Sequence, residues 1–256
     1  MRAGVIGTGH VGLVTCASLA AMGHEVTGFD VDHDKISLLR EGLTPFYEPG
    51  LDELLGEATR SGRLDFSTRI EDAVEKADVV FICVGTPARA NGEANLVAVE
   101  DAAREVVRKA RPGLVIVEKS TVPAGTARRL KQVLERERPD IADRLHVVSN
   151  PEFLREGQGV DDAMRPDRIL VGAESPYAFA VVRDLYGPLI KRGSELIETD
   201  IPTAELSKHA CNAFLALKIS YANALAQICE LAGADVVCVT KVMGSDPRIG
   251  AHFLQA

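Results

Sequence analysis

The sequence predicts an α/β protein, in which a doubly wound parallel sheet is followed by a long connecting helix. Short apolar runs alternate with longer segments whose apolar residues recur at helical spacing, which is the pattern of repeated β–α units. A glycine-rich turn separates the first apolar run from the first helical segment. From residue 200 the pattern changes to one helical stretch that continues without a breaker to about residue 232.

The strands and helices are expected in regular alternation along the first part of the chain. Short apolar runs predict strands at 2–6, 25–30, 79–84, 114–118, 145–149, 168–172 and 195–199. Helical periodicity predicts helices at about 10–22, 32–41, 50–60, 70–76, 95–110, 123–137 and 176–187. Because most consecutive strands are separated by a helix, the crossovers favour a parallel sheet.

Residues 1–199 are expected to form this α/β domain, and residues 200–256 a helical central region used for dimerisation. Pro202 suits the first turn of a helix that extends over about 203–232, and a second helix is expected at about 235–243. Apolar residues along the long helix, such as Phe214 and Leu217, suggest that it is substantially packed. Its length suggests a connection between domains or subunits, and we expect a homodimer.

Composition excludes several classes of protein. The net charge is -8 and basic residues form no cluster, which argues against nucleic acid as a partner. No apolar stretch reaches the length of a membrane span, and the chain opens directly on a strand, so neither a membrane anchor nor a signal peptide is expected. The five cysteines are scattered without metal-ligand spacing, which favours a reducing cytoplasm and no metal site.

The glycine-rich turn Gly7-Thr8-Gly9-His10-Val11-Gly12 predicts a dinucleotide site on a Rossmann-like sheet. Its glycines allow a tight turn and close approach of a pyrophosphate to the backbone of His10 and Val11 at the helix start. Asp30 ends the second strand, where a carboxylate accepts hydrogen bonds from ribose hydroxyls and repels a 2′-phosphate, so NAD is favoured over NADP. The alternative is a glycine-rich turn beside a surface aspartate. Lys35 is a further candidate near the adenine, or simply a surface lysine.

Polar residues follow three later strands. Gly85 and Thr86 end one strand, and Thr121 ends the next, where hydroxyls could bond the ribose or nicotinamide, although Thr121 could equally cap a helix. The stretch 150–157 places Glu152 and Glu156 four residues apart at a strand end, which indicates either a ligand pocket or a solvated turn with an ion pair.

Lys208 and Asn212 share one face of the long helix because they are four residues apart. A lysine on a packed helix could transfer protons or stabilise an oxyanion. Alternatively, it extends its ammonium group to solvent.

Seven motifs occur in an order that resembles one family over the whole chain. They are Gly7-x-Gly9-x-x-Gly12, Tyr47-Glu48-Pro49-Gly50-Leu51, Gly85-Thr86-Pro87, Ser120-Thr121-Val122-Pro123, Asn150-Pro151-Glu152-Phe153-Leu154-x-Glu156-Gly157, Glu205-x-x-Lys208-x-x-x-Asn212 and Asp246-x-Arg248-Ile249-Gly250. Together they resemble the UDP-glucose 6-dehydrogenases of the UDP-glucose/GDP-mannose dehydrogenase family. The second motif is shared with enzymes for GDP-mannose and UDP-N-acetyl sugars, so another nucleotide sugar remains open.

The resemblance implies oxidation of the C6 alcohol of a UDP-sugar to a carboxylate with two NAD in succession. By this similarity, Thr121 helps to place the reaction-centre water, Glu152 acts as a general acid or base and in hydrolysis, and Lys208 stabilises the oxyanion. Asn212 would orient the sugar or the water. Phe153, Leu154 and Glu156 would line the substrate and nicotinamide region, and Arg248 would reach the substrate across a dimer interface.

The chain departs from the family pattern at its end. In the family, the last motif is followed by a glycine-rich stretch with the catalytic cysteine, and by a second α/β domain; here the sequence ends at Ala256. Cys211 lies nearest to Lys208 and Asn212, but no motif identifies it as a substitute. We therefore expect a truncated enzyme that binds NAD without completing the oxidation. The alternatives are a natural short NAD-binding and dimerisation module, or a two-electron dehydrogenase that needs no cysteine.

Overall fold

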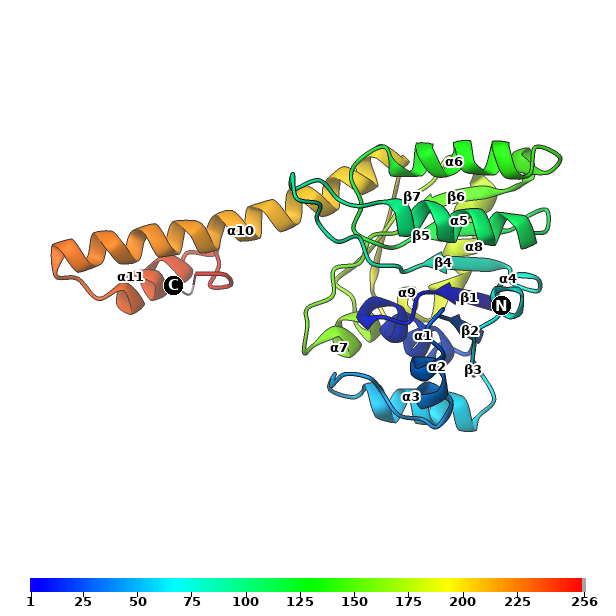
Figure 1. Cartoon of the computed structure of the whole chain (residues 1–256). Helices are drawn as coiled ribbons and strands as arrows, with labels where there is room; N and C mark the ends of the chain where they lie inside the picture. The colour runs from blue at the N-terminus through cyan, green and yellow to red at the C-terminus, as the bar shows by residue number, and fades with distance from the viewer. Residues whose placement is uncertain (255–256) are drawn as a thin grey trace. The chain divides into compact units, whose positions relative to one another are not determined.

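The computed structural model describes residues 1–254, over which an eight-stranded sheet with the order β3-β2-β1-β4-β5-β6-β7-β8 is flanked by helices (Figure 1). The strands are β1 (Arg2–Ile6), β2 (Glu25–Phe29), β3 (Leu64–Ser67), β4 (Val79–Ile82), β5 (Val115–Glu118), β6 (His146–Ser149), β7 (Arg168–Gly172) and β8 (Glu195–Thr199). The α/β prediction is confirmed. The expected strands are all present, and β3 was missed because it is short and lies at the edge of the sheet.

The helices follow the predicted alternation. They are α1 (His10–Ala21), α2 (His33–Arg40), α3 (Leu51–Arg60), α4 (Ile70–Val74), α5 (Val97–Lys109), α6 (Thr126–Glu137), α7 (Gly159–Met164), α8 (Pro176–Leu185) and α9 (Gly187–Ile190), then α10 (Ile201–Ala232) and α11 (Val236–Gly244). Side-chain caps mark the starts of α2, α8 and α11, where Asp32, Ser175 and Asp235 accept backbone N–H groups. The short helices α7 and α9 have too few turns to show helical periodicity, so the sequence did not predict them.

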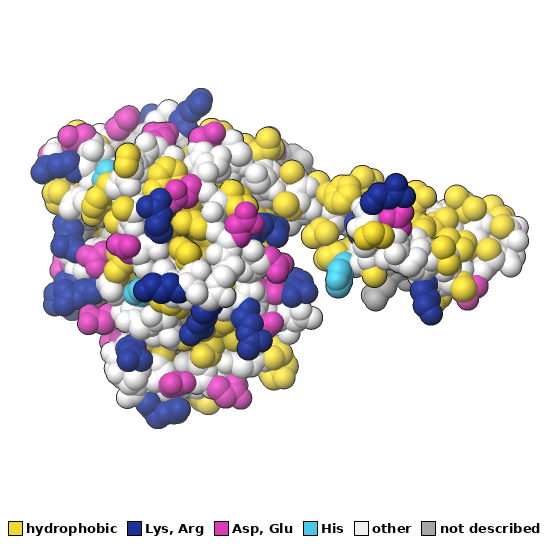
Figure 2. Space-filling view, turned by 180° about the vertical axis from the view of Figure 1, so that it is seen from behind, with side chains coloured by type: hydrophobic (Ala, Val, Ile, Leu, Met, Phe, Trp, Pro, Cys, Tyr) yellow, Lys and Arg dark blue, Asp and Glu magenta, His cyan; other side chains and the backbone are white. Residues whose placement is uncertain are grey.

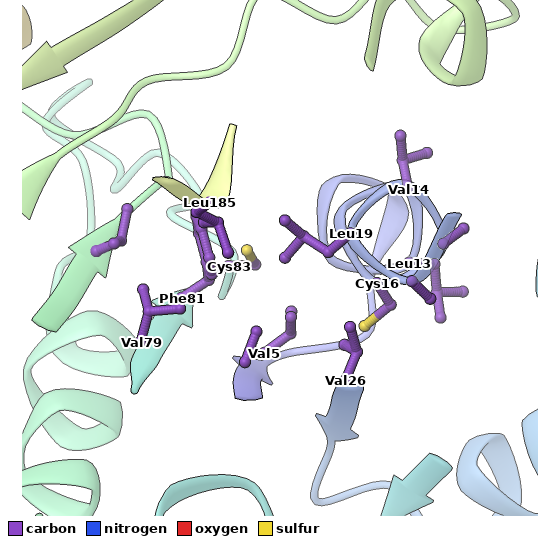
Figure 3. Packing of buried hydrophobic residues seen from close by; sticks show 14 of the residues in the cluster. Val5, Leu13, Val14, Cys16, Leu19, Val26, Val79, Phe81, Cys83 and Leu185 are labelled. Carbon is purple, nitrogen blue, oxygen red and sulfur yellow. The ribbon is translucent and has the colours of Figure 1, made fainter. Parts of the chain in front are cut away.

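Two apolar layers cover the two faces of the sheet. Along β4, Val79 and Phe81 face the layer formed with α1, α3 and α8, whereas Val80 and Ile82 face the layer formed with α4, α5 and α6. Figure 3 shows part of the first layer between α1 and the strands. Because both faces are covered, the central strands are apolar throughout rather than alternating.

The sheet is not parallel throughout, which corrects the prediction. Among the described residues, β6 and β7 pair antiparallel through a single register pair, Ser149 with Gly172, while β7 and β8 pair in parallel. The segment between β6 and β7 contains only α7, which packs against α1 instead of crossing over the sheet. The chain therefore enters β7 in the reversed direction.

The chain forms two compact units, Met1–Leu206 and Ser207–Ala256. Most of α10 and all of α11 belong to the second unit. The expectation that α10 is substantially packed is wrong for this single chain, since Phe214 and Leu217 are 62% and 60% exposed. Other exposed apolar residues on this unit include Tyr221, Ile228, Leu231, Val237 and Val242. Figure 2 shows many hydrophobic side chains at the surface of this part of the chain. Over the described residues, no helix combines the length and apolar character that crossing a membrane requires.

Candidate functional site

The glycine-rich turn connects β1 to α1 at the carboxyl end of the sheet. Gly9 precedes the first residue of α1, His10, and within residues 1–254 no side chain caps this helix start and no acidic residue lies in its first turn. A Cβ atom on Gly12 would lie 1.9 Å from the carbonyl oxygen of Gly7, so only glycine permits this approach of helix and turn. The backbone amides at the start of α1 can therefore receive an anion.

Asp30 follows β2 and binds the glycine-rich turn directly. Its Oδ2 accepts hydrogen bonds from the backbone N of Thr8 at 2.9 Å, from Thr8 Oγ1 at 2.8 Å and from Lys35 Nζ at 2.9 Å. Its Oδ1 accepts the backbone N of Asp32 at 3.2 Å. Burial alone would raise the pKa of Asp30, but the bonds from Lys35, Thr8 and Asp32 outweigh it and lower the pKa.

In this arrangement the two carboxylate oxygens of Asp30 have different roles. Oδ2 is occupied by protein donors, while Oδ1 keeps capacity for a ribose hydroxyl, which suits the acidic residue of an NAD site. Thr8, which is fully buried, was not singled out in the sequence, although its place inside the glycine motif could have identified it. Lys35 is half-buried and forms an ion pair with Asp30.

The ends of β4 and β5 lie next to each other, as their parallel register requires. Thr86 Oγ1 donates a hydrogen bond to the backbone carbonyl of Thr121 at 2.9 Å, so the two predicted Thr-Pro segments are joined. Both threonines are half-buried and Gly85 is exposed. The structure thus brings Gly85, Thr86 and Thr121 to the same edge as the glycine-rich turn.

Two buried carboxylates, at the end of β5 and at the start of α10, were not expected from the sequence. Glu118 ends β5 and is 2% exposed, and among the described atoms its Oε1 has no hydrogen-bond partner. Burial raises the pKa of Glu118 well above its ordinary value, Glu205 raises it further, and Ser120 and Lys119 oppose the rise. Glu205 accepts the backbone N of Gly125 at 2.6 Å and of Ala127 at 2.8 Å, where α6 begins.

Asn150 fixes the start of the stretch 150–157. Its side chain donates to the backbone carbonyl of Leu170 at 2.8 Å, and accepts from Tyr186 Oη at 2.7 Å and from Lys119 Nζ at 3.2 Å. This buried amide therefore ties β6 to β7 and to the end of β5.

The two carboxylates of this stretch differ in environment. Glu152 is half-buried and its Oε2 accepts the backbone N of Leu154 at 2.6 Å, whereas Glu156 is exposed. An ion pair joins Arg155 of this segment to Asp162, and the Arg168 guanidinium lies 4.1 Å from the centre of the Phe153 ring. Phe153 and Leu154 are half-buried, so the segment offers apolar and polar groups together.

Glu48 connects the glycine-rich turn to the end of the same stretch. Its carboxylate contacts His10 Nε2 at 2.6 Å and accepts the backbone N of Gly157 at 3.0 Å and of Gly159 at 2.8 Å. The sequence indicated only a loop leading into a helix at this position.

The remaining candidates lie on the second unit. Lys208 is buried at 5% exposure, whereas Asn212 is exposed and Cys211 half-buried. Arg248 is exposed and binds Asp246, with Nη2 and Oδ2 2.6 Å apart.

Neither thiol at the core of the sheet domain suits nucleophilic chemistry. Burial raises the pKa of Cys16 well above its ordinary value, and that of Cys83 to about 12, so both thiols stay protonated near neutral pH. Among residues 1–254, no group of three or more His, Cys, Asp or Glu side chains is placed to hold a metal ion.

Comparison with known proteins agrees with this geometry. Residues 1–190 match the model of the NAD binding domain of the UDP-glucose/GDP-mannose dehydrogenase family, and residues 202–256 match the central domain of that family. The chain is 43% identical over its whole length to UDP-glucose 6-dehydrogenase YwqF of Bacillus subtilis, of which it covers 57%. It is also 43% identical to a UDP-glucose 6-dehydrogenase of Pseudomonas aeruginosa, with the same coverage.

Solved structures show the same likeness. A UDP-glucose dehydrogenase from the archaeon Pyrobaculum islandicum aligns over 99% of this chain and 58% of its own, with a TM-score of 0.94 and 40% identity. A GDP-mannose dehydrogenase from Pseudomonas aeruginosa aligns over 96% of this chain and 57% of its own, with a TM-score of 0.91 and 34% identity. The chain thus spans somewhat more than half the length of its relatives. It belongs to the UDP-glucose/GDP-mannose dehydrogenase family.

Proposed function

We propose that this chain is the NAD-binding and central part of an NAD-dependent UDP-glucose 6-dehydrogenase, with residues 1–199 as the NAD-binding domain and 200–256 as the central region. The reaction would convert UDP-glucose, two NAD and water to UDP-glucuronate and two NADH. The observation that carries the proposal is the cradle formed by Asp30, Thr8 and the uncapped start of α1. Identity of 43% to UDP-glucose 6-dehydrogenases supports UDP-glucose over other nucleotide sugars.

The residues of the cradle fit a dinucleotide. The start of α1 would hold the pyrophosphate, since among the described residues no side chain caps it and no acidic residue lies in its first turn, and Asp30 would hold the adenosine ribose through Oδ1. Gly85, Thr86 and Thr121 lie at the strand ends where the nicotinamide half would extend. The chemistry that NAD would supply at this site is acceptance of a hydride.

The residues of the chain would act on the sugar side as follows. Glu152 would take or return a proton at the sugar C6 oxygen, in reach of solvent because it is half-buried. Thr121 would place a water, Lys208 would stabilise negative charge on the oxygen, and Asn212 would orient the sugar. Phe153, Leu154, Glu156 and Arg248 would contact the substrate.

The proposal is tested with the purified chain by titration with NAD and NADP in parallel. We expect NAD to bind with at least about tenfold preference, because Asp30 repels a 2′-phosphate. Equal affinity for both cofactors would contradict the assignment of the cradle. None of the five cysteines lies in the motif of the family nucleophile, so we expect negligible NADH from UDP-glucose by this chain alone. Two NADH per sugar would contradict that expectation.

We further propose a homodimer through α10 and a cytoplasmic location. The exposed apolar side chains of Phe214, Leu217 and Leu231 support the dimer, and five scattered cysteines without the spacing of a disulfide framework support a reducing compartment. Sedimentation or light scattering should give twice the chain mass. The double substitution Phe214→Ser with Leu217→Ser should give the monomer with unchanged NAD affinity.

A further inference from the structure

Glu48 is a buried carboxylate whose hydrogen bonds join two segments that are far apart in the sequence. Its side chain is 1% exposed. It contacts the His10 ring at the start of α1, and it accepts the backbone amides of Gly157 and Gly159 at the start of α7. These three contacts come from the glycine-rich turn on one side and from the end of the stretch 150–157 on the other.

The carboxylate of Glu48 is ionised, and both of its oxygens accept hydrogen bonds from protein groups. Burial alone would raise its pKa, but the bonds from His10, Gly157 and Gly159 outweigh it and lower the pKa below its ordinary value. Oε2 receives His10 and Gly157, while Oε1 receives Gly159. A buried carboxylate with these donors has no need of a ligand, so Glu48 acts on the position of its partners.

The junction is closely packed around this carboxylate. A Cβ atom on Gly159 would lie 3.1 Å from His10 Cε1 and 3.6 Å from the carboxyl carbon of Glu48. The ring centres of His10 and Phe46 are 5.3 Å apart, and α1 packs against α7. A displacement of the glycine-rich turn is therefore transmitted to the start of α7 through atoms that are in direct contact.

We propose that Glu48 is a positioning residue that couples NAD binding at the glycine-rich turn to the order of the segment 152–159. The inference rests on the proposed NAD site, because it needs NAD to fix His10 through the backbone at the start of α1. Binding then holds the His10 ring against Glu48, and Glu48 holds the amides of Gly157 and Gly159. Gly157 directly follows Glu156, and Glu152 lies five residues before Gly157, so the cofactor would order the substrate side before the sugar arrives. Linkage makes the effect reciprocal.

The experiment combines calorimetric NAD titration with amide hydrogen exchange at Gly157 and Gly159. In the unaltered chain, NAD should slow exchange of both amides by about fivefold or more. In Glu48→Gln, which keeps the shape and removes the charge, NAD affinity should fall about tenfold and NAD should no longer slow exchange at these two amides. Gly159→Ala keeps Glu48 but displaces the junction, so it should reproduce both effects.

Two substitutions serve as matched controls. Asp78→Asn removes a carboxylate that accepts the backbone N of Arg2 at 2.9 Å and pairs with Arg111, at the opposite edge of the sheet from the glycine-rich turn. Gly187→Ala introduces a Cβ with nothing within 4 Å among the described atoms. Both should leave NAD affinity within about twofold and keep the NAD-dependent protection.

The outcomes separate this inference from the proposed function. Absence of NAD binding to the unaltered chain would refute both. If the unaltered chain binds NAD and Glu48→Gln retains its affinity and amide protection, the coupling is refuted while the NAD site stands. If Glu48→Gln does not fold, His10→Ala decides by the same exchange measurement, because it leaves Glu48 and its amide donors in place. Retained protection by NAD in that variant would overturn the proposal.

Discussion

Gly12 and Gly9 belong to one motif, but the structure predicts opposite consequences when each is replaced by alanine. A Cβ on Gly12 would lie 1.9 Å from Gly7 O and 2.9 Å from Gly7 C, which are backbone atoms held by the turn. A Cβ on Gly9 meets no described atom within 4 Å, and Gly9 has an unstrained φ of -74°. We therefore expect Gly12 to be needed for folding, and Gly9 for close approach of the cofactor.

The contact distances of the added Cβ atoms determine how much each substitution should lower the free energy of unfolding. An ordinary C···O contact needs ~3.3 Å, so Gly12→Ala must move backbone by about 1.4 Å in a packed layer. Overpacking commonly costs about 1–3 kcal/mol, and displacement of backbone places this substitution at about 3 kcal/mol or more. That is a large share of the roughly 5–15 kcal/mol of a typical domain. Gly9→Ala should change the free energy of unfolding by about 1 kcal/mol or less, since only the helix cap preference changes.

Urea unfolding and NAD titration measure the two effects separately. Gly12→Ala should unfold at clearly lower urea, whereas Gly9→Ala should unfold nearly as the unaltered chain does but bind NAD at least about tenfold more weakly. An unchanged urea midpoint in Gly12→Ala would refute the steric argument. Native NAD affinity in Gly9→Ala would refute the placement of the pyrophosphate.

Three further substitutions test individual groups. Asp30→Ala should abolish the preference for NAD over NADP in parallel titrations, and should cost about 1–3 kcal/mol of unfolding free energy because buried Thr8 loses its acceptor; an unchanged preference would contradict the ribose assignment. The raised folded-state pKa of Glu118 means that the unfolded chain releases this proton first, so stability falls as pH rises from the ordinary glutamate pKa towards the folded value. Glu118→Gln should remove this slope, which is at most about 1.4 kcal/mol per pH unit, in urea unfolding over a series of pH values above the ordinary glutamate pKa; identical slopes would show that Glu118 is not the source. Tyr186→Phe removes the bond to Asn150 and should cost about 0.5–1.5 kcal/mol in the same assay; an unchanged urea midpoint would contradict this expectation.

The sequence predicted the central strands because burial on both faces leaves uninterrupted apolar runs, as in β4 and β5. The sequence likewise predicted the glycine motif and Asp30, because a short spacing defines their geometry. The burial and the contacts of Glu48 and Glu118 could not be predicted from the sequence. Glu48 meets Gly157 and Gly159 across separations of 109 and 111 residues, and no local pattern specifies such partners. Glu118 looked like the polar end of a strand, and only the packed structure shows that it is buried.

The single antiparallel pair between β6 and β7 has a consequence for how the first unit opens. One register pair is a weak seam, because the other neighbouring strands are joined by ladders of several pairs. We expect β7, β8 and α8 to exchange with solvent as a cooperative block of their own, separate from the block that contains β1 and β4. The side chain of Asn150 connects the two blocks across this seam through its hydrogen bond to the backbone carbonyl of Leu170. Loss of this hydrogen bond would let the two blocks separate at Asn150, two residues before Glu152.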